Sequence, residues 1–314
     1  IRKGETKPIE LTLIREVIKV QSVKSKVVEP GYGWVRITQF QENTIAELAK
    51  AITGLYKEGK LQGLVLDLRN DPGGLLDAAV AISAAFLPPD VVVVSTNGQL
   101  AESKQVYKAT PGDYLRRPGQ DPLKRLPEAT RAALKSVPLI VLVNEGSASA
   151  SEIVAGALQD HGRATIMGSQ TFGKGSVQTV RPLGPDTGLK LTTARYYTPS
   201  GKTIQAKGIM PDVLVDDTAE GSPFAVLRTR EADLEKHLGN GREQEVKDPA
   251  REKAREEAMK RLEEEAKKPA AERRPPEFGS AKDFQLQQAL NRFKGQPVLV
   301  SKTQTERKAE AAVA

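Results

Sequence analysis

The stretch that decides the fold runs from Val137 to Gln178 and reads VPLIVLVNEGSASASEIVAGALQDHGRATIMGSQTFGKGSVQ. Five consecutive apolar residues, 139–143, have the length and β-branched content typical of a buried strand. A turn of small residues follows, and the apolar positions after it recur at helical spacing. A strand, a tight turn and a helix in this order place the turn at a helix N-terminus, where unpaired backbone N–H groups stabilise an oxyanion. The pattern therefore predicts a nucleophilic serine in the turn.

The lysine of the downstream segment TFGKG is the natural partner for such a serine. Cysteine is absent, which excludes thiol catalysis and thiolate metal sites. Of the two histidines, His161 is the one near the turn, and a helix that starts near Ser149 places it about 18 Å away at 1.5 Å per residue. A Ser-His-Asp triad is therefore disfavoured, and Lys174 is the candidate base.

The segments GSASASEIVAGALQD and TFGKGSVQ, with the spacing between them, resemble the carboxyl-terminal processing proteases, also called tail-specific proteases, a serine-lysine peptidase family. The resemblance extends from about Gly31, in PGYGWVRITQF, through GLVLDLRNDPGG to about Asp212, in GIMPD. It implies that Ser149 is the nucleophile, that Lys174 is the general base and that Gln178 orients the lysine. It implies no cofactor, and no metal-ligand cluster is visible in the sequence.

The implied Ser149–Lys174 dyad is chemically reasonable. A serine hydroxyl is a poor nucleophile until a base takes its proton. A lysine accepts a proton only when it is neutral, and burial in apolar surroundings favours that form. Glycines on both sides let the backbone turn closely around the lysine, and Phe172 offers apolar cover. Gln178 orients an amine without adding a negative charge that would favour its protonated form.

Each piece of this pattern also has an ordinary structural interpretation. Serines before a helix are usually N-caps, and this applies to Ser147, Ser149 and Ser151 alike. A lysine between two glycines is ordinarily a solvated loop residue. The two features together, at this spacing, favour the catalytic interpretation. Asp160, near the end of the predicted helix, is interpreted as a carboxylate that bonds nearby backbone and is left out of the catalytic set.

A second strand–glycine–helix unit lies earlier in the chain. Residues 63–69 (GLVLDLR) read as a continuous apolar strand of a sheet covered on both faces, and a helix is expected from Leu75 to about Phe86. Between them lies NDPGG. By resemblance, the oxyanion hole combines the N–H of Ala150 with an N–H from Gly73 or Gly74. The family more often has N-x-G-G-G here, so the choice of glycine stays open, and a plain tight turn is the alternative.

The resemblance implies an α/β fold, with a layered, crotonase-like core of βαβ-type units over residues 31–218. Residues 97–136 form an insertion rich in Pro-Gly pairs, with helical content near 127–136, and we expect a lid, an interaction arm or an irregular surface loop. The patterns predict further strands at 33–40, 91–95, 177–183 and 188–197, and a helix at 42–59.

Residues 1–30 alternate apolar and polar side chains, which predicts one or two edge strands. In the resembled family a PDZ module precedes the catalytic core, and IRKGETKPIELTLIRE looks like the last strands of that module. Residue 1 is not methionine, and neither a targeting segment nor a run of 18 apolar residues is present. We therefore expect a fragment or a processed product. The resemblance implies a bacterial periplasm or cell envelope.

Residues 219–314 differ in composition from the core. Residues 248–268 are charged helix formers with a thin apolar stripe, and 284–293 predict a second amphipathic helix. We expect these stripes, in order of preference, to make a homo-oligomer contact, to pack back on the same core, or to stay solvated.

The expected function is hydrolysis of peptide bonds near the C-termini of protein substrates through an acyl-enzyme. Protein or peptide substrates are the expected partners, with an activating adaptor protein as a candidate. A non-catalytic scaffold that binds peptide tails and an acyl-CoA enzyme are the alternatives. The net charge is +7, but the basic residues are interleaved with 40 acidic ones and 4% of residues are aromatic. Nucleic-acid binding is therefore not expected.

Overall fold

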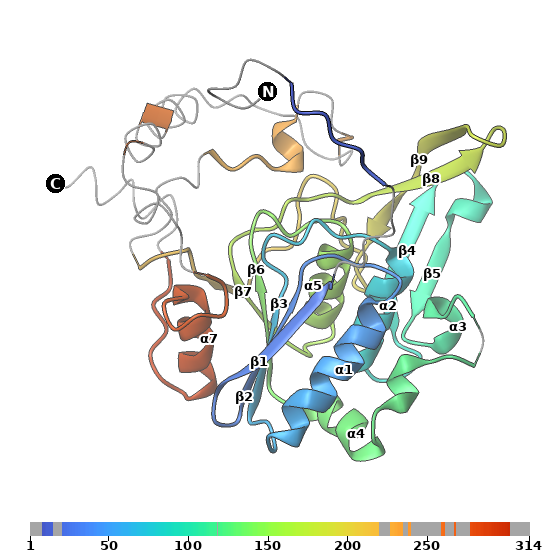
Figure 1. Ribbon diagram of the computed structural model, residues 1–314. Helices are drawn as coiled ribbons and strands as arrows, with labels where there is room; N and C mark the ends of the chain where they lie inside the picture. Colours follow the sequence, from blue (N-terminus) through green and yellow to red (C-terminus); the bar gives the residue numbers. More distant parts are fainter. Residues whose placement is uncertain are drawn as a thin grey trace.

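The computed structural model describes residues 8–14, 21–117, 119–219, 227–234, 238–239, 259–260, 267 and 277–301. They form a mixed α/β fold with two sheets (Figure 1). The strands are β1 (Val23–Glu29), β2 (Tyr32–Ile37), β3 (Gly63–Asp67), β4 (Val92–Gly98), β5 (Gln105–Lys108), β6 (Leu139–Val143), β7 (Thr165–Gly168), β8 (Ser176–Pro182), β9 (Gly188–Tyr197) and β10 (Val213–Leu214). The α-helices are α1 (Thr44–Lys57), α2 (Leu76–Phe86), α3 (Pro111–Tyr114), α4 (Glu128–Ser136), α5 (Ala150–Asp160) and α7 (Phe284–Phe293).

The six-stranded sheet, in the order β1-β2-β3-β6-β7-β10, positions the site. Strands β2, β3, β6, β7 and β10 are parallel, and β1 is antiparallel to β2. Every residue of β3 and β6 is buried, as expected for parallel strands covered on both faces. The register pairs Asp67 with Leu142, so β3 and β6 end side by side. The turns that follow these two strands therefore meet at the same edge of the sheet.

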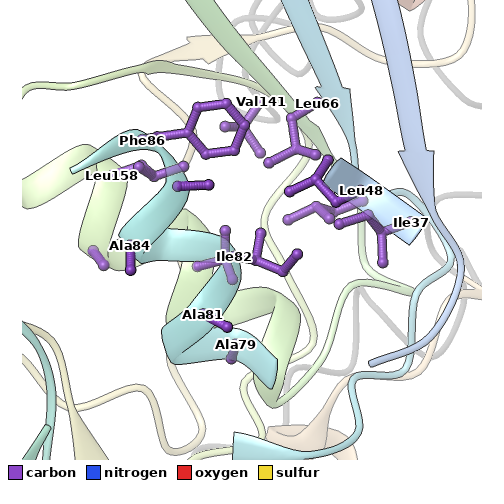
Figure 2. Packing of buried hydrophobic residues seen from close by; sticks show 14 of the residues in the cluster. Ile37, Leu48, Leu66, Ala79, Ala81, Ile82, Ala84, Phe86, Val141 and Leu158 are labelled. Carbon is purple, nitrogen blue, oxygen red and sulfur yellow. The ribbon is translucent and has the colours of Figure 1, made fainter. Parts of the chain in front are cut away.

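Helices α1, α2 and α5 cover one face of this sheet (Figure 1). Figure 2 shows the resulting core, in which apolar side chains of the strands meet those of the helices. Its labelled residues are Ile37, Leu48, Leu66, Ala79, Ala81, Ile82, Ala84, Phe86, Val141 and Leu158. The long apolar face predicted for residues 42–59 is confirmed, because Leu48 and Ile52 of α1 are fully buried.

Helix α7 covers the opposite face (Figure 1). Its buried residues Leu286, Ala289 and Leu290 join a second apolar cluster with sheet residues such as Val65 and Ile140. The apolar stripe of α7 therefore packs back on the core of the same chain, which is the arrangement ranked second. The oligomer contact expected first for the C-terminal region stays a prediction. The other predicted helix, 248–268, lies almost wholly outside the described residues.

The four-stranded antiparallel sheet, in the order β5-β4-β9-β8, contains part of the predicted insertion. Strand β5 pairs with β4, and Tyr114, Leu126 and Leu134 are buried in the main core. Residues 97–136 are therefore not the irregular surface loop expected as one alternative. The strands predicted at 177–183 and 188–197 are confirmed as β8 and β9, which pair in antiparallel orientation.

Within residues 1–30, one predicted edge strand is present as β1, at the edge of the six-stranded sheet, whereas two other features differ from the prediction. Residues 8–14 form neither helix nor strand, and Leu11 and Leu13 are exposed. Strand β1 pairs with β2 across the expected boundary at residue 30, so residues 23–29 belong to the sheet of the core. The PDZ remnant and the crotonase-like architecture stay predictions. None of the described helices combines the length and apolarity needed to cross a bilayer.

Candidate active site

The turn between β6 and α5 holds Ser149 in an unusual backbone conformation. Ser149 is the N-cap of α5, with φ 54° and ψ −109°. A positive φ is uncommon for a residue with a side chain and stores strain that the surroundings must offset. A strained serine on a sharp strand-to-helix turn is the arrangement that exposes a nucleophilic hydroxyl in other hydrolases.

Hydrogen bonds distinguish the three serines of this turn. Ser147 Oγ donates to the carbonyl of Leu68 at 2.9 Å, and Ser151 Oγ donates to the carbonyl of Asp71 at 2.9 Å. Both serines are fully buried. Ser149 is half-buried, and its hydroxyl donates a hydrogen bond to no described residue. Two serines therefore fasten the turn to the segment after β3, and the hydroxyl of the third is available for chemistry.

Glu152 joins the Ser149 turn to the lysine segment. Its fully buried carboxylate accepts hydrogen bonds from the backbone N–H groups of Ser149 at 2.8 Å, Gly173 at 2.7 Å and Lys174 at 2.9 Å. A fourth bond comes from Thr171 Oγ1 at 2.5 Å. Burial raises the pKa of Glu152 to about 7, and these four donors oppose that rise. The prediction missed this residue, although the S-x-x-E spacing of a capping box was readable in the sequence.

The Lys174 amine makes its hydrogen bond to a serine other than Ser149. Its Nζ donates to Ser176 Oγ at 3.4 Å and makes no hydrogen bond to Ser149 Oγ. Gln178 follows a bulge in β8, is exposed, and makes no side-chain hydrogen bond within the described part of the chain. Glu152 thus joins the backbones of Ser149 and Lys174, but the Ser149 hydroxyl and the Lys174 amine are not hydrogen-bonded to each other. Catalytic hydrogen bonds are often long in structures without substrate.

The glycine turn after β3 packs directly against the Ser149 turn. Gly73 has φ 95°, and a Cβ there would lie 2.6 Å from the carbonyl oxygen of Ala148 and 2.8 Å from the nitrogen of Ala150. The Gly73 N–H donates to Asp71 Oδ1 at 2.9 Å. The N–H groups of Gly74 and Ala150 donate to no described residue. Glycine is therefore required at position 73 for close packing, and position 74 offers the unpaired donor.

Asp71 connects the two turns from a buried position. Its carbonyl accepts the N–H of Ala148 at 3.0 Å as well as the Ser151 hydroxyl. Its Oδ2 has no hydrogen-bond partner among the described residues. Burial raises the pKa of the Asp71 carboxyl to about 7, and the hydrogen bond from the Gly73 N–H partly opposes that rise.

The residues considered for other roles lie away from the turn. His161 is the C-cap of α5, at the opposite end of the helix from Ser149, and its Nε2 lies 2.7 Å from the carbonyl oxygen of Val92. This position agrees with the expectation that disfavoured a triad through His161. Asp160 accepts the backbone N–H of Ser200 at 2.9 Å, which confirms the prediction that it bonds nearby backbone.

The sequence profile of Peptidase family S41 matches residues 31–215, which include both halves of this site. The chain belongs to peptidase family S41. A carboxy-terminal-processing protease of Bartonella bacilliformis is 47% identical to the S41 chain over 218 residues, which cover 68% of this chain and 45% of that protein. A carboxyl-terminal-processing protease of Synechocystis is 38% identical over 217 residues, with the same coverage. The S41 chain therefore spans less than half the length of these curated relatives.

Solved structures agree with this membership. The photosystem II D1 C-terminal processing protease aligns with a TM-score of 0.50 and 35% identity, over 64% of the S41 chain and 50% of that structure. A putative S41 protease from Bacteroides fragilis aligns with a TM-score of 0.52 over 80% of this chain and 59% of that one, and at 16% identity this likeness concerns the fold alone. The predicted resemblance to carboxyl-terminal processing proteases is confirmed.

Proposed function

We propose that this S41 chain is a serine endopeptidase that cuts protein substrates near their C-termini, with Ser149 as nucleophile and Lys174 as general base. The observation that carries the proposal is the half-buried hydroxyl of Ser149, which donates to no described residue, on a strained residue at the N-terminus of α5. The Glu152 carboxylate holds the backbone of Lys174 in the same site. The preference for C-termini rests on the names of the relatives.

The proposed reaction begins when neutral Lys174 takes the proton of the Ser149 hydroxyl as Oγ attacks the scissile carbonyl carbon. The N–H groups of Ala150 and Gly74 hold the oxyanion of the tetrahedral intermediate, because neither donates to another described residue. Ala150 directly follows Ser149, and Gly74 follows Gly73, which packs against the same turn. The C–N bond then breaks, and the Lys174 ammonium gives its proton to the leaving amine. A water that loses its proton to Lys174 hydrolyses the acyl-enzyme and regenerates Ser149.

In this proposal the arrangement observed around the lysine is a resting state. The amine that now bonds Ser176 Oγ has to turn toward Ser149, and Gln178 has to approach it from β8. Such side-chain rotations are fast, and substrate binding supplies the apolar cover that favours a neutral amine. An adaptor protein is a further candidate for this closure. A homo-oligomer and a periplasmic or envelope location remain parts of the proposal that rest on the resemblance.

The test is cleavage of unfolded casein by the 314-residue chain between pH 6 and pH 10, together with labelling by a fluorophosphonate. We expect Ser149→Ala to abolish both cleavage and labelling and Lys174→Ala to abolish cleavage. The matched controls are Ser136→Ala and Lys190→Ala, which alter exposed positions on α4 and β9. Activity of the parent should rise with pH as one base loses its proton. Cleavage by Lys174→Ala at the parent's rate would contradict the proposed role of Lys174 as the base. A parent chain that neither cleaves casein nor reacts with the fluorophosphonate would contradict the proposed peptidase activity.

A further inference from the structure

A buried arginine links the C-terminal helix to the segment that carries the glycine turn. Arg69 is 1% exposed and uses all five N–H donors of a guanidinium. It donates to both carboxylate oxygens of Asp67 at 2.9 and 2.6 Å, and to both oxygens of Asp283 at 2.8 and 2.6 Å. The fifth bond goes to Gln285 Oε1 at 2.9 Å. Bidentate charged pairs of this kind fix geometry as well as adding energy.

The two carboxylates belong to distant parts of the chain. Asp67 ends β3, whereas Asp283 is the N-cap of α7 and lies 214 positions from Arg69. Asp283 also accepts the N–H groups of Gly279 and Leu286, so its carboxylate is rigidly placed. The ring of Phe278 lies 4.1 Å from the guanidinium carbon and covers the charge on its flat face. The Arg69 side chain is therefore held both by Asp67 of the sheet and by Asp283 at the start of α7.

The residues before and after Arg69, Leu68 and Asn70, form hydrogen bonds to the turn that carries Ser149. Leu68 accepts the Ser147 hydroxyl through its carbonyl, and the Asn70 N–H donates to Asn144 Oδ1 at 2.9 Å. Asn70 has φ 55°, a strained value for a residue with a side chain. A backbone in this conformation persists only where its surroundings determine it, and the fixed side chain of Arg69 is one of those surroundings.

We propose that Asp283 is a positioning residue for the peptidase reaction: by holding Arg69, it sets residues 68–74 against the Ser149 turn and so aligns the oxyanion donors. The inference rests on the proposed function of Ser149. It makes α7 a part of the catalytic apparatus in addition to a cover for the sheet. Because alignment of an oxyanion hole affects the transition state more than substrate binding, the loss should appear in kcat.

The chain offers a matched control for this role. Lys294, at the other end of α7, forms an ion pair with Glu29 that ties the helix to β1 and does not touch Arg69. Asp283→Asn keeps a good N-cap and one acceptor oxygen, but it replaces the second acceptor with a donor that faces the guanidinium. Lys294→Gln removes one ion pair from the same helix and leaves the Arg69 network intact.

We expect Asp283→Asn to lower kcat about tenfold to hundredfold on a peptide substrate, with KM unchanged within about twofold. Lys294→Gln should keep both constants within about twofold of the parent. Hydrogen–deuterium exchange of the full chain should show faster exchange over 68–75 and 144–151 in Asp283→Asn, and parent-like exchange there in Lys294→Gln. Both measurements are made well below the thermal unfolding temperature of each variant.

Parent-like kcat and exchange in Asp283→Asn would overturn the proposal, as would an equal loss in Lys294→Gln. If Asp283→Asn fails to fold, Gln285→Leu provides the same test, because it removes one acceptor from Arg69 and leaves both carboxylates in place. Parent-like kcat and exchange in that variant would then count against the proposal. A parent without hydrolytic activity would overturn the proposed function, while the exchange measurement would still decide whether Asp283 orders residues 68–75.

Discussion

Two residues with side chains, Ser149 and Asn70, hold positive φ angles on the two turns that form the site. Conformations of this kind cost on the order of 1–3 kcal/mol each. The surrounding hydrogen bonds offset that cost, since Asn70 bonds to Asn144 and the Ser149 N–H bonds to the Glu152 carboxylate. Strain at Ser149 is therefore maintained by specific buried polar groups, and substitutions of these groups should have the largest effect on the site.

Replacing Glu152 with glutamine should disrupt the site without removing its side chain. Above about pH 7, where Glu152 is ionised, the amide keeps one acceptor oxygen but sets an NH₂ group against backbone N–H donors that now meet a carboxylate. Unpaired buried donors cost about 1–3 kcal/mol, so urea unfolding should show a loss of that size. We expect kcat to fall about a hundredfold, because the Lys174 segment shifts relative to Ser149.

Glu58→Gln, an exposed change at the end of α1, serves as the control and should match the parent in both measurements. Parent-like kcat in Glu152→Gln would show that the carboxylate has only a structural role.

The sequence predicted the residues of the proposed chemistry, but it did not predict the buried groups that support them. The small-residue turn and the glycine-flanked lysine pointed to Ser149 and Lys174, and the hydrogen bonds of Ser147 and Ser151 are consistent with that choice. Glu152 was missed because a buried glutamate near a helix start reads as an ordinary cap. Which glycine has a free N–H depends on where the Asp71 side chain points, and no sequence pattern contains that information.

At the scale of elements, two glycines should respond differently to replacement by alanine. Gly73 lies in the turn after β3, and Gly54 lies in helix α1. In Gly73→Ala the new Cβ would collide with backbone atoms of Ala148 and Ala150, at a position with φ 95°. We expect this variant to lose activity and stability together. Gly54→Ala places a methyl group on α1 where nothing lies within 4 Å, and it should stabilise the protein by about 0.5–1 kcal/mol. Thermal unfolding and peptide hydrolysis measure both effects.

A Gly73→Ala enzyme as active as the parent would mean that the two turns separate easily, contrary to the packing described.

Long apolar runs were the elements best predicted from sequence. Strands β3 and β6 match their predictions because buried parallel strands read as continuous apolar residues. Strands β5 and β7 have four residues each and were not predicted, since so few positions show no clear periodicity. The amphipathic stripe of α7 was recognised, but a stripe does not specify what covers it, and the sheet of the same chain does so.

At the scale of the whole molecule, two buried carboxyls should shape the pH dependence of stability. Burial raises the pKa values of Asp71 and Glu152 to about 7. Between their ordinary pKa values near 4 and about pH 7, the folded protein retains protons that the unfolded chain has lost. The stability from these two groups is therefore full below about pH 4 and is lost as the pH rises through about 7.

Urea unfolding of the parent and of Asp71→Asn/Glu152→Gln, in steps from pH 4 to pH 8, isolates this contribution. The free energy of unfolding of the parent, relative to the double variant, should decrease across the window and level off above about pH 7. A relative free energy that increases with pH would show that both carboxyls are ionised throughout.

The two-sided sheet also has a consequence for the chain during its synthesis. The sheet residues of the second apolar cluster end at Val215, and the helix that covers them contributes Leu290, 75 positions later in the sequence. At about 5–20 residues per second, a ribosome takes roughly 4 to 15 seconds to cross that interval. During that time one face of the nascent sheet has no cover from α7, and it is a natural binding surface for a chaperone that holds apolar chains.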